Sequence, residues 1–210
     1  MNMQTDIIER LRSDIDTIQD EMTSLLHSED MFRNRLIPLV EKASVDVSSK
    51  RTLYQAHYTT MLLGVRRQLG RDAEEISLLK LLEKLKENHN LITKSWYSEE
   101  WLKDSSLESD NSTLSEFIAA IPNGEFEEYF GQEYLSSEIV DKDIEKLTQA
   151  TESIKTFVDK RLAHRDKKDP EIVKEEEYKS ALQTLEKLIS KYILLLKQVG
   201  MSRLTPTMQD

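Results

Sequence analysis

The stretch that decides the fold runs from Tyr178 to Val199 and reads YKSALQTLEKLISKYILLLKQV. Its apolar residues recur at steps of three and four, which is the spacing of one face of an α-helix. From Leu185 onwards this face becomes wide, so the helix must be covered from two sides. A central bundle helix and a dimer-forming helix both meet that requirement. Asp169-Pro170 marks its expected start and Gly200 its expected cap.

The same spacing predicts three further long helices. They run from Thr5 to Leu26, from Ser48 or Ser49 to Leu69, and from Ser136 or Ser137 for about 25 residues. Shorter helices are expected to start at Ser28, with a kink or division at Pro38, and at Ser77.

No useful run of alternating apolar and polar residues predicts a strand. The sequence therefore predicts an all-α antiparallel helical bundle of four long helices with shorter ones. A coiled-coil rod is the structural alternative. It is disfavoured because proline, glycine and an inserted segment interrupt the helical pattern.

Composition predicts a single helical domain over residues 1–210. The chain has 210 residues, 38% of them hydrophobic, which is enough for one good-sized core. It has no cysteine, which fits a reducing cytoplasm, and no apolar run long enough to span a bilayer. We therefore expect a soluble, cytoplasmic protein that does not associate with membranes. The net charge of -10 argues against general coating of nucleic acids, so RNA would have to meet a confined basic patch.

Residues 94–136 are expected to form an insert or a mobile segment that covers one end of the bundle. Trp96, Tyr97 and Trp101 lie at its start and precede a polar stretch rich in Ser and Asp. These aromatic rings either stack on bases or pin the segment to the core. Short helices are predicted at 114–121 and 126–134, on either side of Pro122.

The most unusual stretch chemically is 155–168, KTFVDKRLAHRDKK. It contains six cationic and two acidic side chains at the end of a long helix in an acidic chain. On a helical projection Arg161 and Arg165 lie near the buried face, with His164 beside it. Desolvated charge at such a place needs a partner or a task. The simpler interpretation is that these cations complement the helix dipole and bond the last free carbonyls.

Two further polar residues flank the buried face of the helix ending near Leu69. Arg66 either pairs with Asp72 or a carboxylate on another helix, or serves catalysis. His57, on the opposite flank, is expected to make ordinary packing contacts.

Several chemistries lack the residues that they need. The sequence has no glycine-rich phosphate loop, no Gly-x-Ser-x-Gly motif, no cysteine nucleophile and no Glu-x-x-His pair. No helical face offers two histidines at ligand spacing. We therefore expect neither a metal site nor a cofactor.

The phrase KRLAHRD at 160–166, late in one long helix and followed by another, resembles the signature region of the HEPN superfamily. Within it, the chain most resembles the abortive-infection branch and its uncharacterised bacterial relatives. LGVRRQ at 63–68, ISLLKLL at 76–82 and NLITK at 90–94 are similar to patterns of the same relatives. The resemblance implies an antiparallel bundle that dimerises through the helices bearing the motif.

Active HEPN proteins are metal-independent ribonucleases in which an arginine and a histidine of each subunit meet at the dimer cleft. The resemblance implies that His164 transfers protons while an arginine holds the phosphate. The family arginine stands between one and two helical turns before the histidine, where this chain has Phe157, Val158 and Asp159. Arg161, Arg165 or Arg66 is expected to replace it.

The predicted site contains catalytic residues and residues that bind nucleic acid. Asp166 is expected either to orient His164 or to pair with an arginine. The expected catalytic residues are His164, Arg161 and Arg165, and those expected to bind nucleic acid are Lys160, Lys167, Lys168 and Arg66.

Two functions remain open. The first is a HEPN-like protein of a bacterial defence or toxin-type system, a metal-independent endoribonuclease that cleaves RNA at a homodimer cleft. The second is a non-catalytic helical scaffold, either a homodimer or the partner of another defence protein. The displaced arginine and the net charge favour the second, and the basic stretch favours the first.

Overall fold

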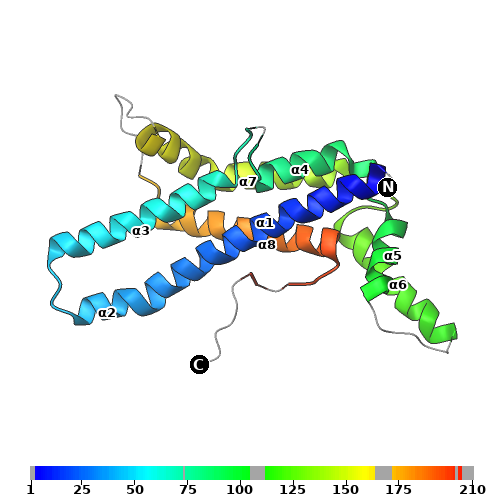
Figure 1. Cartoon of the computed structure of the whole chain (residues 1–210), viewed down its shortest axis with the longest axis horizontal. Helices are drawn as coiled ribbons and strands as arrows, with labels where there is room; N and C mark the ends of the chain where they lie inside the picture. Colours follow the sequence, from blue (N-terminus) through cyan, green and yellow to red (C-terminus); the bar gives the residue numbers. More distant parts are fainter. Residues whose placement is uncertain (1–2, 73, 105–111, 164–171, 202, 205–210) are drawn as a thin grey trace.

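The computed structural model describes residues 3–72, 74–104, 112–163, 172–201 and 203–204, with only the backbone for 3, 104, 112–119, 162 and 163. In this part of the chain all regular elements are helices (Figure 1). Thr93 and Tyr134 form a single antiparallel β-bridge. The elements are α1 (Met3–Met31), η1 (Phe32–Leu36), α2 (Ile37–Lys42), α3 (Val47–Arg67), α4 (Leu78–Glu87), η2 (His89–Leu91), α5 (Lys94–Asp104), α6 (Ser112–Tyr129), α7 (Ser137–Phe157), η3 (Val158–Ala163) and α8 (Glu175–Lys197).

Four long helices, α1, α3, α7 and α8, form the predicted all-α bundle. The central helix α8 packs against α1, α7 and α3 (Figure 1), so its wide apolar face is covered by helices of its own chain. Leu185, Ile189 and Tyr192 on that face are fully buried. No helix among the described residues has the length and apolarity needed to cross a membrane.

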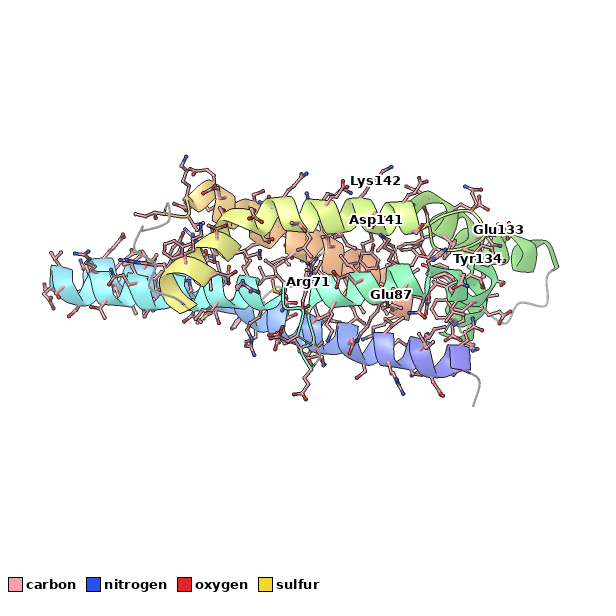
Figure 2. All side chains as sticks on the ribbon, turned by 90° about the horizontal axis from the view of Figure 1, so that it is seen from above. Arg71, Glu87, Glu133, Tyr134, Asp141 and Lys142 are labelled. Carbon is pink, nitrogen blue, oxygen red and sulfur yellow. The ribbon has the colours of Figure 1, made fainter. Side chains whose placement is uncertain are left out.

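The heptad-like spacing of α7 is confirmed by its burial pattern. Val140, Leu147, Ile154 and Val158 are buried, and Ser136 caps the helix by accepting a hydrogen bond from the Ile139 N–H. The short helix α4 packs against α7, and Figure 2 shows Asp141 on α7 and Glu87 in the last turn of α4. An ion pair of 2.7 Å between Lys86 and Asp141 joins these two ends.

Ser28 does not start a helix, contrary to the sequence prediction. Instead α1 continues to Met31, and the irregularity is a π-helical turn, η1, just before Pro38. Proline lacks an N–H and its ring clashes with the carbonyl four residues earlier. A widened turn at that place relieves the clash while the chain keeps its direction.

The ends of α8 also differ from the prediction. The helix starts at Glu175, where the Glu177 carboxylate accepts a hydrogen bond of 2.8 Å from the Lys174 N–H. At the other end Gln198 takes the left-handed conformation expected at Gly200, with φ of 55°. Its side chain donates to the Leu195 carbonyl at 2.8 Å, which offsets the cost of that conformation.

Within the insert, the single helix α6 replaces the two short helices predicted at 114–121 and 126–134. α6 passes through Pro122 without a break and packs against α5 at one end of the bundle (Figure 1). Phe126 and Phe130 are buried against Tyr97 of α5, with ring centroids 5.5 and 5.9 Å away. We infer that this packing offsets the hydrogen bond that Pro122 cannot make.

The hairpin made by α1–η1–α2 and α3 projects beyond the other helices in both views (Figures 1 and 2). From residue 33 to residue 60 no side chain is fully buried. The next buried residue is Met61, where α3 enters the bundle.

Candidate functional site

The basic stretch predicted from the sequence, 155–168, begins in the last turn of α7 and continues into a π-helical segment. α7 ends at Phe157, and η3 continues the chain over Val158–Ala163. Val158 is buried and fixes this segment on the bundle. π turns are rare and occur often at functional sites, because they change the direction of the side chains that follow.

Arg66 reaches this segment from α3. Its Nε–H donates to the Asp159 Oδ1 at 2.7 Å, which confirms the prediction that Arg66 pairs with a carboxylate of another helix. The partner is Asp159 and not Asp72. The Arg66 side chain is 29% exposed. The ion pair therefore holds a guanidinium, partly open to solvent, against one of the positions where the resemblance expects an arginine.

Two of the other predicted cations can be placed. Lys160 and Arg161 are exposed on η3. His164, Arg165, Lys167 and Lys168 lie outside the described residues, as does Asp166. The described part of the predicted site thus consists of the three cations Arg66, Lys160 and Arg161, with Arg66 contributed by a different helix and paired with Asp159.

A surface groove of about 760 Å³ between α7 and α8 leads away from this helix end. Lys160 and the exposed Ile172 line one end, and Glu152, Glu176 and Glu177 lie along it. A polyanion in this groove would meet more negative than positive charge. We therefore do not assign the groove itself to nucleic acid.

A second polar cluster, which the sequence reasoning missed, lies at the base of the hairpin. His57 Nε2 lies 2.7 Å from Glu29 Oε2, and the Arg33 Nε–H donates to the other oxygen of Glu29. The His57 ring stacks on Phe32 with centroids 3.7 Å apart. The buried Tyr178 hydroxyl belongs to the same cluster. These side chains surround a cavity of about 260 Å³.

The electrostatics of this cluster favour an ionised carboxylate next to a protonated tyrosine. Burial raises the pKa of Glu29, but hydrogen bonds from His57 and Arg33 lower it by more, so the pKa lies below its ordinary value. Burial and then the charge of Glu29 raise the pKa of Tyr178.

An imidazole oriented by a carboxylate is also the arrangement of a general base. Here Phe32 covers one face of the His57 ring, and the contacts of the described residues bring no hydroxyl or thiol nucleophile to it. The cluster therefore acts as a polar tie between α1 and α3. No group of three or more metal-ligating side chains occurs among the described residues.

A third cluster joins α7 to α8 through a buried carboxylate. Asp143, whose side chain is 2% exposed, accepts from Lys146 at 2.9 Å, from Lys191 at 2.5 Å and from the Tyr192 hydroxyl at 3.1 Å. Burial raises the pKa of Asp143, but Lys191 and Lys146 lower it by more, so the pKa falls below its ordinary value. We assign this cluster a structural role.

Asp143→Ala is expected to destabilise the protein by about 3–5 kcal/mol in urea unfolding, because Lys191 and Tyr192 would lose their buried acceptor. The depressed pKa means that the contribution is present above the ordinary value of 3.8 and is lost as the pH falls through the lower folded-state value. The difference between wild type and variant should therefore shrink below about pH 4. Asp141→Ala, which removes an exposed ion pair, should change stability by less than about 0.5 kcal/mol. Equal effects of the two variants would contradict the assignment.

The three aromatic residues of the insert serve packing. Tyr97 is fully buried, and Trp96 packs against the core with the Arg12 guanidinium 5.6 Å from its ring. Trp101 is half-buried. The interpretation that aromatic rings pin the insert to the core is confirmed for Trp96 and Tyr97.

Comparison with known proteins returned no match to a family model, to a curated protein or to a solved structure.

Proposed function

We propose that this chain is a HEPN-like, metal-independent endoribonuclease that acts on RNA at the end of α7 and η3, with His164 as the acid/base. The observation that supports the proposal is the ion pair between Arg66 and Asp159. Asp159 occupies one of the positions where the family arginine is expected, and Arg66 brings a guanidinium to it from α3. In this proposal Arg66 replaces the absent arginine in preference to Arg161 or Arg165.

The guanidinium has donors left for a phosphate. Its Nε–H is used by Asp159, and a guanidinium offers five N–H donors in a fixed fork. Phosphate oxygens fit that fork well. A second cation, Lys160, is exposed on η3 and can bind a neighbouring phosphate.

The reaction class follows from the residues proposed. The His164 imidazole removes the proton of a ribose 2′-hydroxyl, whose oxygen then attacks the adjacent phosphorus. The bond from phosphorus to the 5′-oxygen breaks, and this oxygen takes up a proton. The products are a 2′,3′-cyclic phosphate and a 5′-hydroxyl. Arg66 stabilises the charge on the phosphoryl oxygens.

A homodimer and a role in bacterial defence belong to the same proposal. Ile172, 79% exposed, lines the α7–α8 groove together with Lys160 of η3 and offers an apolar contact for a second copy. The defence or toxin-type role rests on the resemblance of KRLAHRD to the abortive-infection branch.

The non-catalytic scaffold remains the second candidate because of one specific observation. Arg66 already has a carboxylate partner, as a purely structural arginine would. A protein partner or a second copy would then be the only ligand.

Arg66→Ala should lower the rate of RNA cleavage in EDTA by about a hundred- to a thousand-fold, because one donor to the developing charge is lost. The matched control is Arg67→Ala, an exposed neighbour on α3, which should stay within about twofold of wild type. Asp159→Ala removes the ion pair but keeps the guanidinium, and should lose less than about tenfold. Equal losses for Arg66→Ala and Asp159→Ala would mean that the pair is structural and that Arg66 does not hold the phosphate, whereas no RNA cleavage by the wild type would support the scaffold.

A further inference from the structure

The projecting hairpin leaves apolar side chains without cover. Leu39 is 64% exposed, Val47 is 83% exposed, and Leu36 and Tyr54 are also exposed. The distal part of α3, residues 47–60, extends roughly 20 Å at 1.5 Å per residue. In the described structure, only the two helices of the hairpin run along this distal part, whereas at the base they also pack against α8.

These residues border a groove on one side of the hairpin. The groove has a volume of about 480 Å³ and is lined by Met31, Phe32, Leu36 and Leu39 of α1–η1–α2, with Ser28, Arg35 and His57 at its edges. The apolar lining residues follow one another at near-helical spacing along a single face. A concave apolar strip of this kind fits the apolar face of a third helix.

The charge of the hairpin selects the partner. Residues 31–54 contain five basic side chains (Arg33, Arg35, Lys42, Lys50 and Arg51) and two acidic ones (Glu41 and Asp46), a net charge of +3 in a chain of net charge -10. At a Debye length of about 8 Å in physiological salt, a partner in the groove meets mainly the charges close to it, and Arg35 is the cation in the groove lining.

We propose that this groove binds an acidic amphipathic helix of a protein partner. The apolar face of the partner helix covers Met31, Leu36 and Leu39, and an acidic flank faces Arg35. A second copy docked hairpin to hairpin would bring two positive charges together, and a bilayer would need a convex apolar surface in place of a groove. This proposal does not rest on the proposed ribonuclease site, whose described residues are Arg66 of α3 and Lys160 of η3.

The probe is a labelled peptide of about 18 residues with leucine at helical spacing and glutamate on the flanks. Its fluorescence anisotropy is measured while the full chain is added. Two control peptides have the same length: one has the same composition in scrambled order, and one has lysine in place of glutamate. We expect saturable binding of the acidic peptide, at least tenfold weaker binding of both controls, and weaker binding as salt is raised.

Variants of the hairpin locate the binding surface. Leu39→Asp should weaken peptide binding at least tenfold, and Val47→Asp, a change at a more exposed apolar residue outside the groove lining, should stay within twofold. Both sites are exposed, so circular dichroism should show folded protein in both cases. Absence of peptide binding, equal binding of the scrambled peptide, or equal effects of the two variants would overturn the proposal. So would dimerisation lost in Leu39→Asp, or binding of vesicles of phosphatidylglycerol in place of the peptide.

Discussion

Leu185→Asp is expected to unfold the protein. Leu185 has no exposed surface and lies on the wide face of α8, the helix that α1, α7 and α3 surround. Truncating a buried leucine costs about 2–5 kcal/mol, and a buried carboxylate without a partner adds several more. The sum is comparable with the whole stability of a domain, about 5–15 kcal/mol. Circular dichroism and urea unfolding measure the loss.

The control for this variant is Lys187→Asp, two residues along the same helix on an exposed face. This variant also introduces an aspartate, but at an exposed position. It should shift the free energy of unfolding by less than about 1 kcal/mol. A Leu185→Asp protein with an unchanged thermal midpoint would show that α8 is not the central helix.

His164→Ala should lower the rate of RNA cleavage in EDTA by about a hundred- to ten-thousand-fold, the range that a general acid or base contributes. The reason is that the proposed mechanism has one imidazole to accept the proton of the 2′-hydroxyl. The rate is measured on a defined RNA in single-turnover conditions, with excess protein.

The matched control replaces a histidine whose hydrogen bond is local in sequence. His89 lies in η2, where its Nδ1 is 3.0 Å from the Lys86 carbonyl oxygen. His89→Ala should retain the wild-type cleavage rate. If His89→Ala and His164→Ala cleave RNA equally well, the activity does not come from the proposed site.

The long helices were predictable because their apolar spacing is strong and unambiguous. In both α7 and α8, the residues on the apolar face expected from the sequence are buried in the structure. Whether α8 faces its own chain or a second copy was not predictable, since both arrangements bury the same side chains. Only the packing of α1, α7 and α3 around it decides this question.

Local signals failed where tertiary packing outweighed them. Ser28 has the residue type of a helix cap, yet α1 continues past it because the same apolar face continues to Phe32. Pro122 was expected to separate two helices, but buried Phe126 and Phe130 hold α6 together beyond it. Burial energy of several kcal/mol exceeds the cost of one missing hydrogen bond.

The polar clusters were the least predictable features. Arg66 was expected to find a carboxylate on another helix, but its partner, Asp159, depends on how α3 packs on η3. The pair of Glu29 and His57 needs the register of the hairpin, although both residues lie at similar distances from its turn. The charge of the stretch 155–168 could be read directly, but the contact of its Asp159 with Arg66 could not.

The ends of the RNA products test the central claim most directly. Wild-type protein incubated with a defined RNA in EDTA should give new 5′-hydroxyl and 2′,3′-cyclic phosphate ends, because the 2′-hydroxyl of the substrate is the nucleophile. End labelling and mass spectrometry distinguish these from 5′-phosphate ends. The account predicts cyclic phosphate ends for wild type and none for His164→Ala. Intact RNA with wild type, 5′-phosphate ends, or the same ends at the same rate with His164→Ala would contradict it.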